Sequence, residues 1–162
     1  MIDKHLINLA LIEDLRGGQD MTSVATIAED SVSTADFVTR KDGVLAGIEM
    51  VAATLSEVGL SDITIVKRDG EKINKGDVLL TVKGNTRLIL LAERTALNFV
   101  GHLSGVATLT SHWVNAVSGT SCIVRDTRKT TPGYRQLEKY AVRMGGGTNH
   151  RMSLSDAALI KD

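Results

Sequence analysis

The last quarter of the chain is rich in side chains that could bind an anion. Between residues 125 and 151 the only acidic side chains are Asp126 and Glu138. The basic side chains of this segment are Arg125, Arg128, Lys129, Arg135, Lys139, Arg143, His150 and Arg151. Because like charges at this density repel one another, the segment predicts a negatively charged partner close by.

Two of these cations stand where ligand sites commonly form. Arg128 and Lys129 follow the segment 121–127, whose apolar residues predict a strand. Folds of the α/β class build binding sites at the carboxyl ends of their strands. The Arg fork matches a carboxylate or phosphate, whereas Lys offers a point charge. The alternative interpretation is a surface loop whose charges bind nothing.

A second cationic pair, His150 and Arg151, follows the glycines 145–147. A single His is more often structural than catalytic, but beside Arg151 it forms a plausible carboxylate-binding pair. The glycines lack the spacing of a phosphate-binding loop and predict the end of a helix instead.

Three further cations are expected to face solvent. Arg135, Lys139 and Arg143 follow one another at intervals of four residues, on the side of a short helix opposite Leu137. Such a stripe predicts a hydrated surface rather than a ligand site.

Three other features, outside residues 125–151, contain residue types that could take part in chemistry. Arg94 and Asn98 share one side of a largely apolar helix, so a buried Arg94 needs an anionic partner such as Glu93, or reaches into a site. Cys122 lies in the predicted strand and is expected to be a buried, inert thiol. The remaining histidines have no metal-ligand spacing, which disfavours zinc; they are His5, His102 and His112.

The hydrophobic pattern predicts the elements that would position these residues. The predicted helices cover 3–15, 48–58, 86–117 (divided at Gly101 and Gly105) and the short stretch around 137–144. The predicted strands cover 32–40, 43–47, 62–68, 78–82 and 121–127. We expect two domains, 1–117 and 118–162, and interpret the final DAALIKD as the end of a parallel strand. The chain is therefore expected to be the N-terminal part of a longer protein.

Composition narrows the function class. The chain has 19 basic and 19 acidic side chains, but residues 1–120 carry 11 basic and 15 acidic ones, and residues 121–162 carry 8 and 4. With only five aromatic residues, stacking platforms for nucleic acid are missing, so a small anion is the expected partner. The longest apolar run, 88–92, is too short for a membrane span. The single cysteine fits a cytoplasmic location.

Several motifs together resemble one family. They are EDLRGGQDMTS at 13–23, ERTALN and LSGVAT within 93–108, DTRKTTPG at 126–133, EKYAVRMGGGTNHR at 138–151 and SDAALIKD at 155–162. In this order they resemble quinolinate phosphoribosyltransferase, the nicotinate-nucleotide pyrophosphorylase (carboxylating). The resemblance implies an α/β fold: an N-terminal α/β-sandwich domain followed by the beginning of an incomplete α/β barrel.

The resemblance also implies an activity and a site. Phosphoribosyl pyrophosphate and quinolinate, with Mg²⁺, would give nicotinate mononucleotide, pyrophosphate and CO₂ in NAD biosynthesis. It implies that the carboxylates of quinolinate are bound by Arg128, His150, Arg151 and Lys161. Lys129 would lie near the phosphates, Lys129 and Lys161 would be the catalytic lysines, and Arg94 would enter the site of a neighbouring subunit in a homodimer. No metal ligand is assigned in this chain, and the chain alone is expected to be inactive.

Two alternatives stay open on the sequence. One is a molybdenum-transport-associated relative of the same fold with another substrate. The other is a binding module, because residues 69–84 resemble the hairpins of biotinyl and lipoyl carriers, although they lack a lysine at the hairpin tip.

Overall fold

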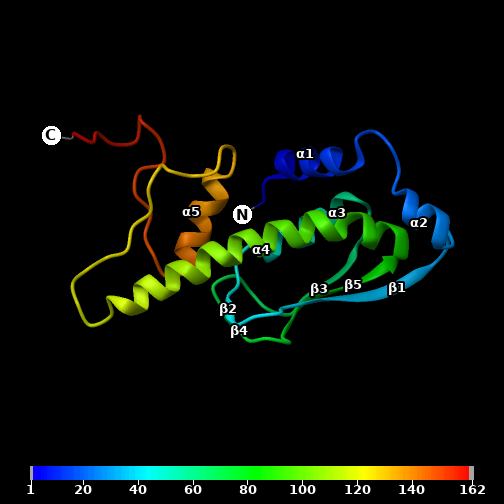
Figure 1. Ribbon diagram of the computed structural model, residues 1–162, viewed down its shortest axis with the longest axis horizontal. Helices are drawn as coiled ribbons and strands as arrows, with labels where there is room; N and C mark the ends of the chain where they lie inside the picture. The colour runs from blue at the N-terminus through cyan, green and yellow to red at the C-terminus, as the bar shows by residue number, and fades with distance from the viewer. Residues whose placement is uncertain (1, 161–162) are drawn as a thin grey trace.

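The computed structural model describes residues 2–160 and shows a mixed α/β architecture in which one long helix joins two parts (Figure 1). The helices are α1 (Lys4–Leu15), α2 (Met21–Thr26), α3 (Ile48–Glu57), α4 (Thr86–Ala116) and α5 (Arg135–Met144). The strands are β1 (Val32–Val38), β2 (Gly43–Val44), β3 (Asp62–Ile65), β4 (Lys72–Ile73) and β5 (Val78–Asn85).

The N-terminal part is a small sheet covered by helices. Strands β1, β5 and β3 form an antiparallel sheet in that order, and β2 pairs with β4 in a second, two-stranded ribbon. Apolar residues of β5, such as Leu80 and Val82, are fully buried against α3 and α4. This arrangement confirms the predicted N-terminal α/β sandwich, and it makes residues 69–84 part of that sandwich rather than a separate carrier hairpin.

The first two helices begin at side chains that cap them. The Asp3 carboxylate accepts a hydrogen bond from the Leu6 amide at 3.0 Å, and Asp20 accepts one from the Ser23 amide at 3.1 Å. Each cap satisfies an amide that the first helical turn leaves without an intrahelical partner. The structure therefore confirms the predicted helix start at Asp3.

The predicted break of the long helix at Gly101 and Gly105 is wrong. Helix α4 is continuous over 31 residues and curves along the whole molecule (Figure 1). Each glycine costs about 0.5–1 kcal/mol relative to alanine within a helix. Burial of Phe99, Leu103 and Ala107 along the same stretch outweighs that cost. Within residues 2–160, no helix combines the length and apolar character needed to cross a bilayer.

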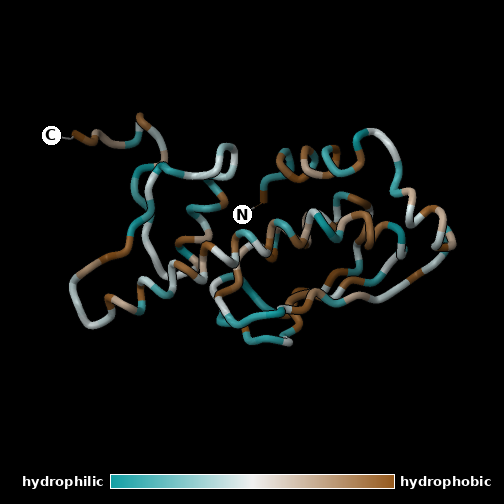
Figure 2. The backbone as a smooth tube through the Cα atoms, in the orientation of Figure 1, coloured by the Kyte–Doolittle hydropathy of each residue, from teal (hydrophilic) through white to brown (hydrophobic). Residues whose placement is uncertain are grey.

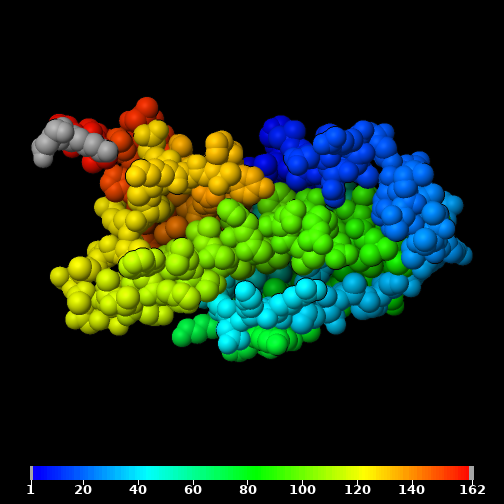
Figure 3. All heavy atoms as spheres, in the orientation of Figure 1, coloured from blue at the N-terminus to red at the C-terminus, as the bar shows by residue number. Residues whose placement is uncertain are grey.

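Helix α4 continues into a second core that carries α5. Phe99, Leu103 and Ala107 of α4 pack with Leu137 and Ala141 of α5 and with the buried face of α1. Along the tube in Figure 2, hydrophobic and hydrophilic residues alternate around α4, as expected for a helix with one buried side. In the space-filling view the residues after α4 form a lobe at one end of the molecule (Figure 3).

At the carboxyl end of α5 the backbone approaches α4 very closely. A Cβ atom at Gly145 would collide with the carbonyl oxygen of Ala107 and with the side chain of Thr110. Only a residue without a side chain fits at this contact, which agrees with the predicted role of the glycines in ending the helix.

Residues 121–127 do not form the predicted strand. They are extended but make only a single parallel bridge, between Arg125 and Thr148. A strand needs a continuous ladder of partners, and residues 2–160 supply no neighbouring strand beyond that bridge. For the same reason Cys122 is exposed rather than buried. Residues 155–160 are irregular and exposed, and Lys161 lies outside the described residues.

Candidate functional site

The cationic loops are joined by one buried carboxylate, Asp126. It accepts hydrogen bonds from Lys139 Nζ at 2.5 Å, from the His150 amide at 2.8 Å and from the side-chain amide of Asn149. Its side chain is 7% exposed and that of Lys139 is 1% exposed. The loop that contains Arg128 and the loop that contains His150 are therefore held together by a buried ion pair.

His150 is fixed on both sides of its backbone. Its amide donates to Asp126, and its carbonyl accepts a hydrogen bond from Lys139 Nζ at 2.8 Å. The ring Nδ1 accepts a hydrogen bond from the Arg151 amide at 2.8 Å. Because Nδ1 accepts, Nε2 is the ring atom that carries the proton and stays available as a donor to an anion.

The guanidinium of Arg128 is partly buried and has an unused donor. Its Nε is buried and has no hydrogen-bond partner among the described residues. A buried donor without a partner is costly, and an anionic ligand is one group that could satisfy it. Lys129 is exposed, and its amide donates to Thr127 Oγ1 at 3.0 Å. Arg151 Nη1 donates to the carbonyl of Ala157 at 2.6 Å.

The prediction that Lys139 faces solvent is wrong. Helix α5 packs on α4 through the side that carries Leu137, and its opposite side is covered by the two cationic loops. The periodicity of a helix shows which of its sides is apolar, but it does not show whether loops cover the opposite side. The acid that pairs with Lys139 is Asp126, from the loop that precedes the helix.

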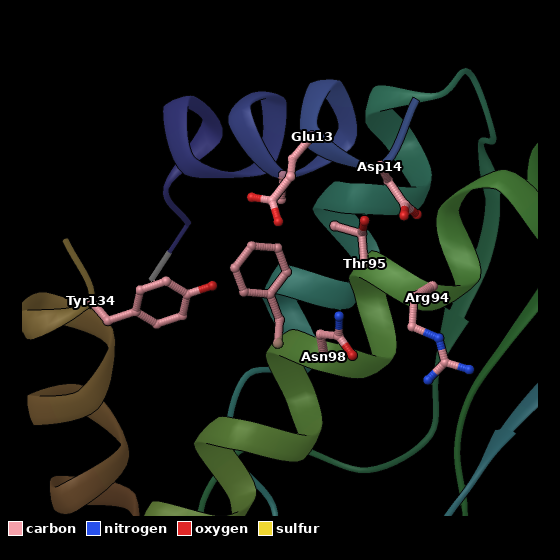
Figure 4. A pocket seen from close by; sticks show the side chains of 8 residues that line it. Glu13, Asp14, Arg94, Thr95, Asn98 and Tyr134 are labelled. Carbon is pink, nitrogen blue, oxygen red and sulfur yellow. The ribbon is translucent and has the colours of Figure 1, made fainter. Parts of the chain in front are cut away.

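Arg94 lies away from these loops, on the exposed surface of α4. It lines a cavity of about 140 Å³ together with Glu13, Asp14 and Tyr134, whose side chains surround the opening in Figure 4. It also borders a wider groove of about 960 Å³ between α4 and β1. Arg94 is exposed and makes no ion pair within residues 2–160, so of the two alternatives the structure does not form the pairing with Glu93.

Glu138 links the cationic loop to α4. Its carboxylate accepts a hydrogen bond from the Thr131 amide at 3.2 Å and lies 2.9 Å from His102 Nε2. The guanidinium of Arg135, three residues earlier in the chain, bonds Thr130 and the carbonyl of Met152. Burial raises the pKa of Glu138, but the hydrogen bonds from Thr131 and His102 lower it further, so the pKa lies below its ordinary value.

The lowered pKa of Glu138 predicts a specific loss of stability in acid. The carboxylate stabilises the folded chain above its unfolded pKa of about 4.3, and this contribution is lost as the pH falls through the lower folded value. We expect Glu138→Gln to cost about 1 kcal/mol of unfolding free energy at pH 6 and a smaller amount at pH 3, measured by urea unfolding. Glu57→Gln, at an exposed carboxylate of α3, is the control. An equal cost at both pH values would contradict the prediction.

Sequence reasoning missed the residues that hold the site together. Asp126, Lys139 and Asn149 lie within the motifs but were not assigned to the site. One signal was available: Asp126 is one of only two acidic residues, with Glu138, in a segment of otherwise basic charges. That signal could not say which of several cations pairs with Asp126, because the answer depends on how the loops fold over α5.

The fold is an α/β sandwich followed by two basic loops that one buried ion pair holds together. The family model for the N-terminal domain of quinolinate phosphoribosyl transferase matches residues 20–104, and the model for its C-terminal domain matches residues 106–162. The chain belongs to the quinolinate phosphoribosyltransferase family.

Curated relatives support the same assignment. The chain is 51% identical to the nicotinate-nucleotide pyrophosphorylase (carboxylating) of Mycobacterium leprae, covering 98% of this chain and 57% of that protein. It is 42% identical to a quinolinate phosphoribosyltransferase (decarboxylating) of Nicotiana tabacum, covering 98% of this chain and 45% of that protein. The chain thus spans about half the length of the curated relatives that it matches.

Solved structures share the fold as well. The structure of NadC from Streptococcus pyogenes superposes with a TM-score of 0.90 at 37% identity, covering 95% of this chain and 55% of the other. The nicotinate-nucleotide pyrophosphorylase of Francisella tularensis gives a TM-score of 0.90 at 41% identity, with coverage of 96% and 56%. These matches confirm the predicted fold, including the partial second domain.

Proposed function

We propose that this chain provides the quinolinate-binding part of a phosphoribosyltransferase that forms nicotinate mononucleotide, pyrophosphate and CO₂ from quinolinate and phosphoribosyl pyrophosphate. The observation that carries the proposal is the buried contact that joins the loops of Arg128 and His150. It holds the loop of Arg128, whose buried Nε has no partner among the described residues, next to the loop of His150, so both loops can present donors to a rigid dianion. A cytoplasmic location is part of the proposal.

In this proposal the cations, together with the Nε2–H donor of His150, bind and orient the substrate. Arg128, His150, Arg151 and Lys161 hold the two carboxylates of quinolinate, and Lys129 lies toward the phosphates. The ring nitrogen is then held against C1 of the ribose while pyrophosphate leaves through an oxocarbenium-like state. When the adjacent carboxylate departs as CO₂, the electron pair left on C2 is stabilised by the quaternised ring nitrogen, and C2 takes up a proton from water. The chain contributes position and charge and forms no covalent bond.

The residues described do not fit a Mg²⁺ site. The carboxylate that joins the cationic loops, Asp126, already accepts three hydrogen bonds, including one from a buried ammonium. Mg²⁺ is held by carboxylate oxygens and ordered waters, and residues 2–160 contain no cluster of three or more potential ligands. Mg²⁺ therefore stays part of the proposed reaction through the phosphoribosyl pyrophosphate, and we derive no step through it.

The proposal predicts binding without turnover for this chain. Calorimetric titration should show quinolinate bound at least tenfold more tightly than nicotinate, because the second carboxylate adds a charge-assisted contact. Incubation with quinolinate, phosphoribosyl pyrophosphate and Mg²⁺ should give no nicotinate mononucleotide at an enzyme-like rate of about 1 s⁻¹. Equal affinity for the two pyridine acids would contradict the proposed site. Turnover would contradict our account of the metal.

The proposal includes a homodimer in which Arg94 enters the partner's site. This is supported by the position of Arg94, which is exposed beside a groove on α4 and apart from the cationic loops. Mixing Arg94→Ala chains with Arg128→Ala chains should restore part of the quinolinate binding, since each mixed dimer has one site that lacks neither residue. Subunit exchange without any recovered binding would show that Arg94 does not serve the partner's site.

A further inference from the structure

We propose that Lys139 and Asp126 are positioning residues, a buried ion pair that fixes His150 and Arg151 for the dianion without touching it. The inference rests on the proposed function, because it concerns how the same site is held in shape. Neither residue was assigned a role by the motifs, and both are almost completely buried.

The ion pair binds the main-chain polar atoms of His150. Asp126 Oδ1 accepts from both Lys139 Nζ and the His150 amide, while Lys139 Nζ also donates to the His150 carbonyl. Both main-chain polar groups of His150 are thus taken by the two members of one ion pair. The peptide planes on either side of His150 are fixed, and the hydrogen bond from the Arg151 amide to Nδ1 then orients the imidazole on that backbone.

The neighbouring residues are held by the same network. The Asn149 side-chain amide donates to Asp126 Oδ2 and, at 2.8 Å, to the Lys139 carbonyl. Its Oδ1 accepts from Arg143 Nη1 at 2.7 Å. The Arg151 amide, in turn, is held by His150 Nδ1. Three consecutive residues, 149–151, therefore depend directly or through one contact on the ion pair.

The pair adds no net charge to the site. One buried positive charge and one buried negative charge cancel, so the field that attracts a dianion comes from the other cations. Removing both charges together leaves the net charge of the lobe unchanged. A positioning role can therefore be separated from an electrostatic one by a double substitution.

The pair also lies outside the hydrophobic core. Lys139 is on the side of α5 away from Leu137 and Ala141, which pack against α4. The Lys139 ammonium bonds Asp126 and the His150 carbonyl, which lie in the two cationic loops on either side of α5. Loss of the pair should loosen these loops while the sheet of the N-terminal part keeps its order.

The experiment compares two double variants of this chain. Asp126→Ala/Lys139→Met removes the buried pair, and Asp77→Ala/Lys67→Met removes a half-exposed pair of 3.6 Å in the N-terminal part. Amide hydrogen exchange followed by NMR should show that the first variant loses at least tenfold protection at His150. Amides of the central strand β5, such as Leu80 and Val82, should keep their protection. The second variant should leave His150 protected.

Two results of the exchange measurement would overturn the proposal. One is unchanged protection of His150 in the Asp126→Ala/Lys139→Met variant. The other is an equal loss of protection in β5, because the pair would then stabilise the whole fold rather than position the loop. The ring tautomer of His150, read from its nitrogen shifts, gives an independent measure: it should be Nε2–H in the original chain and mixed in the variant.

A quinolinate titration then connects position to binding. The variant without the buried pair should bind quinolinate at least tenfold more weakly than the original chain, although its net charge is the same. The Asp77→Ala/Lys67→Met variant should bind as the original does. Equal binding by all three would overturn the positioning role. If the original chain binds no quinolinate, the proposed function fails, and the exchange measurement alone decides whether the pair positions His150.

Discussion

Replacing Lys139 by methionine should lower the free energy of unfolding by about 3–5 kcal/mol. The substitution keeps most of the side-chain volume but leaves the Asp126 carboxylate charged, buried and without its cation. Breaking a buried ion pair in this way costs far more than the intact pair contributes, because the remaining charge has lost both water and its partner. Urea unfolding followed by circular dichroism gives the difference directly.

The matched control for this prediction is Lys67→Met. Lys67 and Asp77 lie 3.6 Å apart with side chains that are 32% and 26% exposed. Water continues to solvate Asp77 when its partner is lost, so the cost should stay below about 1 kcal/mol. If Lys139→Met were as mild as Lys67→Met, the burial of the Lys139 ammonium would be refuted.

Replacing Arg128 or Arg151 by alanine should weaken quinolinate binding by one to two decades each. Each substitution removes a charge-assisted contact of about 1.5–3 kcal/mol. Lysine should rescue Arg128→Ala poorly, because a point charge does not reproduce the planar fork or the donor at Nε. Isothermal titration of the chain measures all three variants. Arg68→Ala, at an exposed position of the N-terminal part, is the control and should bind as the original does.

Unaltered affinity in both alanine variants would remove these residues from the carboxylate site. A drop shared equally by Arg68→Ala would instead point to a general effect of charge. The Lys variant separates the two cases further, since it keeps the charge of Arg128 and loses only the geometry of the guanidinium.

Much of the N-terminal fold could be predicted because local patterns determine it. The alternating burial of β1 and the capping side chain of Asp3 are both visible in the sequence. The helix that begins after Gly47 was predicted within one residue of its end at Glu57. In each case the signal lies within a few residues of the element, so no knowledge of distant contacts was needed.

The errors share one physical cause, which is dependence on partners far away in the chain. Segment 121–127 has strand-like residues but forms only the bridge at Arg125. Gly101 does not break α4, because both halves of the helix bury side chains in a hydrophobic core. The environment of Lys139 is set by loops that lie up to 13 residues away.

The sequence predicted the charged residues of the candidate site but not the residues that hold them in place. Arg128, His150 and Arg151 were identified from their types and from the family motifs. Their mutual arrangement depends on hydrogen bonds to the backbone of His150, which a pattern of residue types cannot reveal. The structure adds the means by which the cations are held, and it leaves Lys161 as a prediction from the resemblance.

The length of helix α4 also fixes the orientation of one end of the molecule relative to the other. The N-terminal half of α4 packs on the sheet and its C-terminal half packs on α5. The length of the helix, roughly 46 Å, therefore sets the distance and the rotation between the sheet and α5. One inserted residue would turn everything beyond it by about 100° and advance it by about 1.5 Å. The groove beside Arg94 and the cationic loops would then face different directions, so the length of this helix is as much a constraint on the protein as any side chain.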